Sequence, residues 1–293
     1  MQKDTASFTA RWVAGARGLG AFLPEALRLV DDPYGLRFTG LSVLREVPSV
    51  ARRVRVAAPL WMRGYVRRFA LLMQLRTRVI DDDVAAFAHA GGRQLVLMGA
   101  GFDCRAWRLA ELSGATVYEV DHPATQARKR EIMKTEPPRG RVVFVPWDFE
   151  HEPLAALPAR LQREGHDAGA PTMTVLEGVV MYLSASALDA TFACVAQYSA
   201  PGSPLAVTYL ETGGLRPVAA HWVGQRAMAR FVGEPFRSSF DPARFADWLS
   251  GRCFHLERDE STSEAAMRLL GFDRARARGL RRTLSHFALA RRV

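Results

Sequence analysis

The chain has 293 residues, of which 48% are hydrophobic and 24% are charged, enough for one large domain or two small ones with a packed core. Charges interrupt every apolar run before it reaches the length of a membrane span, and residues 1–20 lack the apolar stretch of a secretory signal. The three cysteines are scattered without a ligand-like spacing, so neither a disulfide framework nor a zinc site is indicated. We therefore expect a cytoplasmic protein without a structural metal.

The formal net charge of +10 comes almost entirely from arginine, because only Lys3, Lys129 and Lys134 are lysines among the 40 basic residues. Clustered charge of this sign attracts nucleic acid or anionic small molecules. The arginines are spread along the chain, with denser stretches at 51–56 and 273–282. We favour arginine as the ordinary surface cation over a nucleic-acid partner.

The first 90 residues are predicted to be helical. Apolar residues recur at three- and four-residue spacing in 11–30, before the turn signal DDPYG at 31–35, and again in 65–90. The second stretch ends at Gly91 and Gly92, a typical helix stop.

From Gln94 the hydrophobic period changes to that of strands. Helical segments such as 105–112, 123–134 and 185–199 alternate with strand-like runs, and this alternation predicts βαβ units and a mostly parallel sheet. The predicted strands are 94–98, 116–120, 141–145, 172–176 and 204–210.

The pattern breaks after residue 210, where 211–240 is predicted to be a helical insertion. Asp241 and Pro242 then mark the start of a helix. A capping box of Ser261 and Glu264 opens another helix, which ends at Gly271 between two further strands. Those strands are predicted at 253–259 and 285–292.

These elements predict an α/β fold with a Rossmann-like, seven-stranded, doubly wound sheet. We expect a single domain over 1–293. It would consist of an N-terminal helical region at 1–90 and a core at 91–293, with a lid or acceptor-pocket insertion at 211–240.

A glycine turn follows the first predicted strand in the stretch LVLMGAGFDCRAWRL, residues 95–109. Gly99 and Gly101 allow a tight turn and a close approach of a ligand to the backbone. A dinucleotide fingerprint needs a third glycine or an alanine where Cys104 stands. Asp103, at the mouth of the next helix, would repel a pyrophosphate but not an adenosine that carries a sulfonium.

Acids also end the next two predicted strands. Asp121 lies twenty residues beyond Gly101, where a carboxylate can accept hydrogen bonds from ribose hydroxyls. Asp148 is followed by Phe149, and this pair suits the amino group and the ring face of adenine. Each acid alone can equally cap the next helix or turn. Their joint occurrence favours S-adenosylmethionine over NAD.

These motifs together resemble the leucine carboxyl methyltransferase family of class I S-adenosylmethionine-dependent methyltransferases, which includes many bacterial small-molecule O-methyltransferases. The family pattern L-G-A-G-x-D-T-R-x-x-R-L corresponds to 98–109, with Met98 and Cys104 as departures. The resemblance extends over roughly residues 9–290 through the blocks DDPYG, LRTRVIDD, YEVDHPATQARK, PWDF and LEGVVMYLS.

The resemblance implies how the methionine end of the cofactor would be held. Arg76 would bind its carboxylate in a bidentate contact, for which a guanidinium is shaped. Arg17 stands where the family often has a basic residue with a similar task. Glu177 would lie near the amino end of the cofactor and the mouth of the acceptor pocket.

The resemblance also implies the adenosine contacts, with Asp121 at the ribose and Asp148 and Phe149 at the adenine. The residues expected at the cofactor are therefore Arg17, Arg76, Gly99, Ala100, Gly101, Asp103, Asp121, His122, Asp148, Phe149, Glu177 and Gly178.

Several residues allow two interpretations. Tyr182 either orients an acceptor oxygen or packs in the core, and both stay open. His221, in the insertion, is expected to line the acceptor pocket, so Tyr182 and His221 are our candidate catalytic residues, whereas lid packing is favoured for Trp222. For His122 an exposed helix start is favoured over a ribose contact. For Cys104 packing is favoured over a nucleophilic role.

The expected activity is methyl transfer from S-adenosylmethionine to an oxygen of a small natural product, such as a polyketide-like acid. A carboxylate is ionised near neutral pH, whereas a phenol, with a pKa near 10, needs a base. We find no compelling base, which favours a carboxylate and keeps a phenol as the alternative. A non-catalytic RNA- or ligand-binding protein with a degenerate crevice is opposed by the intact acids, and an NAD-dependent reductase by Cys104 and Asp103.

Overall fold

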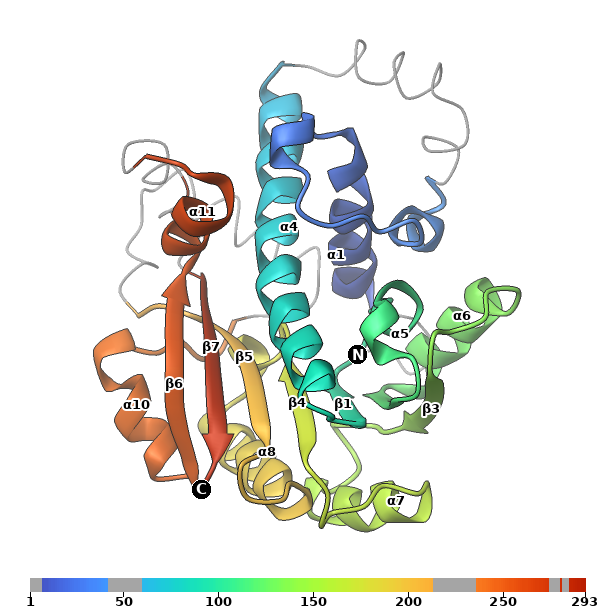
Figure 1. Ribbon diagram of the computed structural model, residues 1–293, viewed down its shortest axis with the longest axis vertical. Helices are drawn as coiled ribbons and strands as arrows, with labels where there is room; N and C mark the ends of the chain where they lie inside the picture. The colour runs from blue at the N-terminus through green and yellow to red at the C-terminus, as the bar shows by residue number, and fades with distance from the viewer. Residues whose placement is uncertain (1–6, 42–59, 213–235, 274–279, 281–284) are drawn as a thin grey trace.

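Seven strands form one sheet in the structure, a computed structural model that describes residues 7–41, 60–212, 236–273, 280 and 285–293 (Figure 1). The strand order is β3-β2-β1-β4-β5-β7-β6, and β7 runs antiparallel to both of its neighbours. The strands are β1 (Gln94–Met98), β2 (Thr116–Asp121), β3 (Arg141–Pro146), β4 (Thr172–Leu176), β5 (Pro204–Leu210), β6 (Phe254–Ser261) and β7 (Ser285–Arg292).

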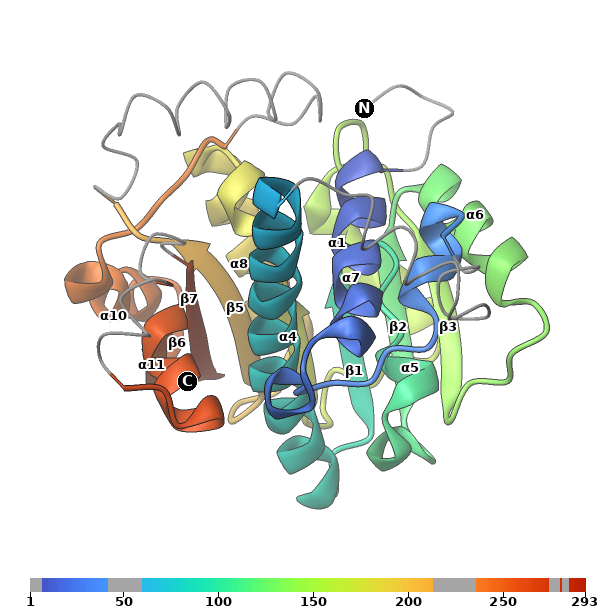
Figure 2. The ribbon, with the colours of Figure 1, turned by 90° about the horizontal axis from the view of Figure 1, so that it is seen from above.

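Helices cover both faces of this sheet. Figure 2 shows α1 and α4 in front of the sheet and α7 and α8 behind it. Among the described helices none is long and apolar enough to cross a membrane. The α-helices are α1 (Phe8–Leu19), α4 (Leu60–His89), α5 (Arg105–Arg108), α6 (Pro123–Met133), α7 (Leu157–Arg163), α8 (Ala185–Tyr198), α10 (Pro242–Ser250) and α11 (Thr262–Leu270).

The core lies on the two faces of the sheet, and alternate residues of each strand supply the two sides. Val96 and Met98 of β1 belong to a cluster with side chains of α7, α8 and α10. Leu95 and Leu97 belong to a second cluster with side chains of α1, α4 and α6. Every residue of β1 and β4 is buried, as expected for central strands covered on both faces.

The strand order reverses between β1 and β4. From β1 the chain continues to β2 and β3 on one side, whereas β4 and β5 extend the sheet on the other. In open α/β sheets, ligands bind at such a switch point, in the crevice at the carboxyl ends of the strands. The fold therefore directs the search for a functional site to the loops after β1 to β4.

The predicted seven-stranded α/β sheet is confirmed, and each predicted strand end lies within two residues of the observed one. The capping box of Ser261 and Glu264 is present, and Gly271 ends that helix with a φ of 60°. The prediction of one helix over 105–112 is wrong. Leu109 adopts an extended conformation with ψ 113°, so α5 has four residues and a separate 3-10 turn carries Leu112 into the core. Of the predicted insertion, 213–235 lies outside the described residues.

Candidate functional site

The residues predicted at the cofactor gather along the carboxyl edge of the parallel strands. The loop 99–103 follows β1, Asp121 ends β2, 147–149 follows β3, and 177–178 follows β4. Because these strands are parallel neighbours, the segments lie along one edge of the sheet. The structure thus brings together segments that are up to 80 residues apart in the chain.

The loop after β1 is fastened to the end of β2. The N–H groups of Gly99 and Ala100 donate to the carbonyl oxygen of Val120 at 2.8 and 3.1 Å. The N–H of Gly101 donates to Oδ2 of Asp121. These bonds set the backbone of the glycine turn directly beside the carboxylate predicted to bind a ribose.

Both glycines of this turn have conformations that other residues rarely adopt. Gly99 has a φ of 67° and Gly101 a φ of 51°. A Cβ on Gly99 would also lie 2.8 Å from Cγ2 of Val179, which follows β4 closely in the chain. Glycine is needed at position 99 for its backbone angle and for the close approach of two strand-end loops.

Asp121 is buried, with 9% of its surface exposed. Burial raises the pKa of its carboxyl, and the N–H groups of Gly101 and His122 lower it in part. The bond from the His122 N–H to Oδ1 measures 2.6 Å. A carboxylate has about four lone-pair positions, so two backbone bonds leave Asp121 able to accept from two ligand hydroxyls.

A second group of predicted residues meets around Glu177, at the end of β4. Nε of Arg76 donates to Oε1 of Glu177 at 2.7 Å, and Nη2 of Arg105 forms an ion pair with Oε2 at 2.7 Å. Burial alone would raise the pKa of Glu177, but Arg105 and Arg76 hold it well below its usual range. Gly178, next in the chain, has a φ of 70°, and a Cβ there would lie 3.5 Å from Nη1 of Arg76. The Arg76 guanidinium therefore lies directly beside the backbone at the end of β4.

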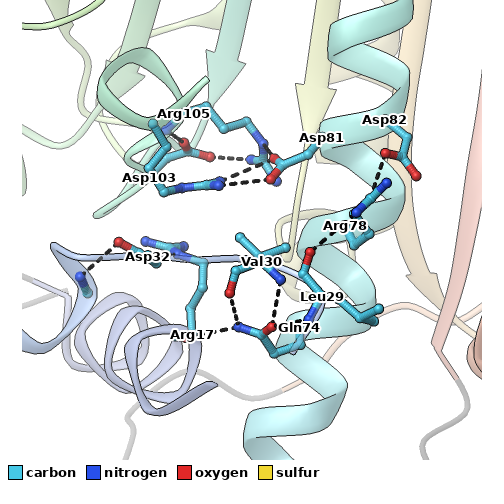
Figure 3. Close-up of polar contacts among 12 residues, drawn as sticks. Arg17, Leu29, Val30, Asp32, Gln74, Arg78, Asp81, Asp82, Asp103 and Arg105 are labelled. Carbon is cyan, nitrogen blue, oxygen red and sulfur yellow. Dashed lines mark hydrogen bonds and ion pairs between the residues drawn. The ribbon is translucent and has the colours of Figure 1, made fainter. Parts of the chain in front are cut away.

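Asp103 and Arg105 form the opposite side of this group. Oδ1 of Asp103 accepts the N–H of Arg105 at 2.7 Å, and Oδ2 pairs with Nη1 of the same arginine. Figure 3 shows Arg105 reaching from α5 toward Asp81 on α4. Nε of Arg105 donates to Oδ1 of Asp81 at 2.7 Å. Asp103, predicted at the cofactor, is thus engaged with the protein's own arginine.

Arg17 is buried at 4% exposure and binds two neighbouring loops. Its Nε donates to Oδ2 of Asp32, which lies beside it in Figure 3, and its Nη2 donates to the carbonyl oxygen of Phe102 at 2.7 Å. Oδ1 of Asp32 accepts the N–H groups of Tyr34 and Gly35 at 2.9 and 3.0 Å. The DDPYG motif therefore ties α1 to the glycine turn after β1.

The residues after β3, together with His122, make local capping contacts. Oδ1 of Asp148 accepts the N–H of Glu150 at 3.0 Å, and Oδ2 contacts Nδ1 of His151 at 2.9 Å. Phe149 is 38% exposed. His122 is the N-cap of α6, where its Nδ1 accepts the N–H of Ala124 at 3.2 Å. The capping alternative weighed for Asp148 is present. His122 lies at the predicted helix start, but it is half-buried rather than exposed, and the contacts of both residues to a cofactor remain predictions.

The candidate catalytic residues are described only in part. Tyr182 is half-buried in a 3-10 turn after β4, with its ring 5.3 Å from that of Phe236. His221 and Trp222 lie outside the described residues. Cys104 is fully buried, and burial raises the pKa of its thiol to about 12, as expected for a packing residue. In the part of the chain that the structure describes, no cluster of side chains could hold a metal ion.

Four residues of this network were not singled out from the sequence, although they stand in motifs that were. Asp32 lies in DDPYG, Asp81 lies in LRTRVIDD, and Arg105 and Arg108 follow the glycine turn. Asp81 bridges the two arginines, because Arg108 contacts both of its carboxylate oxygens at 2.9 and 3.2 Å. In the sequence, these four residues could have been found only because acidic and basic residues stand close together within short motifs.

Comparison with known proteins matches the family model described as leucine carboxyl methyltransferase over residues 10–196. A relative from Mycobacteroides abscessus, named a candidate S-adenosyl-L-methionine-dependent methyltransferase, is 36% identical over 205 residues. The match covers 68% of this chain and 63% of the relative, so the chain spans less than two thirds of its length. A relative of the same name from Mycolicibacterium gilvum is 34% identical over 239 residues, 78% of this chain and 71% of that one.

Solved structures show the same fold at low identity. A DUF574 family protein from Streptomyces avermitilis is 18% identical, with a TM-score of 0.61 over 99% of both chains. A candidate methyltransferase from Thermobifida fusca is 19% identical, with a TM-score of 0.55 over 76% of this chain and 82% of that one. These structures confirm the predicted fold class. Both relatives are named for the cofactor predicted from the sequence, S-adenosylmethionine.

Proposed function

The chain belongs to the leucine carboxyl methyltransferase family of S-adenosylmethionine-dependent methyltransferases, and we propose that it methylates a carboxylate oxygen of a small molecule. The acceptor we propose is an organic acid of the natural-product type. The whole chain would act as one domain, with residues 211–240 contributing to the acceptor pocket.

The described residues fit the cofactor at two places. Asp121 is buried against the glycine turn and retains lone pairs for the ribose hydroxyls. Arg76 is held through Nε by Glu177, so its terminal nitrogens, beside Gly178, are the ones that would receive the methionine carboxylate. Asp121 ends β2 and Arg76 lies beside the segment after β4, so the two groups flank β1 at the carboxyl edge of the sheet, and this placement is the observation that carries the proposal.

The proposed reaction is an in-line displacement. S-adenosylmethionine supplies a methyl group bonded to a positively charged sulfur. A carboxylate oxygen of the acceptor forms the new O–C bond as the C–S bond breaks, and the electron pair of that bond remains on sulfur. Alignment of the acceptor and exclusion of water can contribute about 7–11 kcal/mol. Tyr182 and His221 are the residues we propose to line and orient the acceptor.

A carboxylate acceptor is supported by the balance of charge and proton chemistry. A carboxylic acid is ionised near neutral pH, so no proton has to be removed in the reaction. The arginine-rich chain, with a formal charge of +10, favours the approach of an anionic acceptor.

The test uses S-adenosylmethionine with a tritiated methyl group and pairs of aromatic compounds that carry either a carboxyl or a phenolic hydroxyl on the same ring. We expect transfer to the acids and a product that releases volatile methanol in alkali, because methyl esters hydrolyse and aryl methyl ethers do not. Transfer to phenols alone, with an alkali-stable product, would refute the carboxylate and support the phenolic alternative.

A further inference from the structure

Arg105 is a fully buried charged side chain beside the proposed cofactor site. Only 1% of its surface is exposed, although it stands at the first position of the four-residue helix α5. Each of its three guanidinium nitrogens pairs with a different carboxylate, as Figure 3 shows in part. Nε contacts Asp81, Nη1 contacts Asp103, and Nη2 contacts Glu177.

Glu177 connects this buried arginine to Arg76. One of its oxygens accepts from Arg76 Nε and the other pairs with Arg105 Nη2, both at 2.7 Å. The side chains of Arg76 and Glu177 are 13% and 10% exposed, so the Arg105 side of Glu177 is its inner side. Rotation of the carboxylate away from Arg105 would therefore also turn it away from Arg76.

We propose that Arg105 is a positioning residue for the methionine end of the cofactor, acting through Glu177 on Arg76. This inference rests on the proposed function. Arg105 fixes the orientation and the charge of Glu177, and Glu177 fixes the rotamer in which the terminal nitrogens of Arg76 lie beside Gly178. Arg105 itself contacts no part of the cofactor in this arrangement.

Arginine is required at this position because three acids converge on it from three elements. Asp81 comes from α4, Asp103 from the loop after β1, and Glu177 from the end of β4. A planar guanidinium offers donors in three fixed directions, whereas a lysine ammonium acts as a compact point charge. Arg105→Lys keeps the charge but cannot hold all three carboxylates, so Glu177 loses its fixed orientation.

The test compares two ligands that share the adenosine portion. S-adenosylhomocysteine carries the amino-acid carboxylate, and 5′-methylthioadenosine lacks it. For Arg105→Lys we expect the dissociation constant of S-adenosylhomocysteine to rise about 10- to 100-fold, as for a lost charge-assisted contact, and that of 5′-methylthioadenosine to stay near the wild-type value. If Arg105 had a merely structural role, the substitution would weaken the binding of both ligands equally.

Arg108→Lys is the matched control. Arg108 lies on the same short helix, its side chain is 5% exposed, and it pairs with Asp81 but not with Glu177. We expect this variant to keep the wild-type ratio of the two dissociation constants. An equal change of the ratio in both variants would overturn the proposal.

Glu177→Gln provides a second measurement should Arg105→Lys fail to fold. The amide retains an oxygen for Arg76 but loses the charge. We expect it, too, to weaken the binding of S-adenosylhomocysteine more than that of 5′-methylthioadenosine. An unchanged ratio in Glu177→Gln or in folded Arg105→Lys would overturn the positioning role. Failure of the wild type to bind either ligand would instead refute the proposed function.

Discussion

Glu119 of β2 forms a buried ion pair with α6. It stands two residues before Asp121, the carboxylate that we place at the ribose. Lys129 Nζ of α6 contacts Oε2 of Glu119 at 2.6 Å, and the two side chains are 0% and 1% exposed. Burial raises the pKa of Glu119 to about 7, even though Lys129 lowers it. The Lys129 ammonium also lies 5.2 Å from the ring centre of Trp107. Removal of Lys129 would leave an uncompensated carboxylate in the core.

We predict that Lys129→Met lowers the free energy of unfolding by about 3–5 kcal/mol at pH 8, the usual cost of breaking a buried pair. In a chain of this size that corresponds to a fall in Tm of roughly 6–20 °C. Without Lys129 the pKa of Glu119 rises further above its unfolded value of about 4.5. The loss of unfolding free energy in Lys129→Met is therefore smallest below pH 4.5 and grows as the pH rises through the folded pKa of Glu119.

The assay is denaturant unfolding of the wild type and the variants at pH 5.5 and 8. Lys129→Met/Glu119→Gln should recover most of the loss, because no charge is then buried. Lys134→Met removes an exposed partner of Glu131, with side chains 64% and 61% exposed, and should leave the unfolding midpoint nearly unchanged. A cost that is the same at both pH values, without recovery in the double variant, would show that the ion pair is not its source.

Three further predictions concern single residues. Gly99→Ala should lower the free energy of unfolding by about 1–2 kcal/mol because of its backbone angle, and calorimetry should also show weaker binding of S-adenosylhomocysteine. Gly114→Ala, with a φ of 81° and open space around it, should affect stability alone; equal loss of binding in both would contradict the close-approach argument. Iodoacetamide should modify exposed Cys253 before buried Cys104 in mass spectra, and early labelling of Cys104 would contradict its raised pKa. Burial lowers the pKa of His286, but the contact with Asp259 at 3.1 Å raises it, and the net shift is upward. The protonated His286 therefore stabilises the fold, fully below about pH 6.5, and this stabilisation is lost as the pH rises through the folded pKa. His286→Gln should therefore destabilise more at pH 6 than at pH 9 in thermal unfolding, and the opposite order would refute the assignment.

The centre of the sheet was predictable from sequence because its strands are buried on both faces and read as short apolar runs. β1 and β4 appear in the sequence as QLVLM and TMTVL, and all their residues are buried. The helix boundary at Leu109 was not predictable from periodicity. Arg105 and Arg108 of this short helix pair with Asp81 on α4, and periodicity within 105–112 carries no information about contacts of this kind.

The candidate site was predictable to the extent that it follows the strand ends. Gly99, Gly101 and Asp121 were identified by their spacing, and in the structure the N–H of Gly99 donates to the carbonyl oxygen of Val120 and that of Gly101 to the Asp121 carboxylate. The partners of the charged residues were not predictable, since each ion pair joins separate elements. Arg76 was assigned to the cofactor carboxylate, but its pairing with Glu177, 101 residues away, emerges only from the fold.

Titration calorimetry with S-adenosylhomocysteine, on the wild type and on Asp121→Ala, tests the central claim most directly. The account predicts tight binding by the wild type, a large loss in the folded variant, and no binding of NAD to either protein. Lack of S-adenosylhomocysteine binding by well-folded wild type would contradict the cofactor site. Salt-sensitive retention of that protein on RNA would then support the non-catalytic alternative.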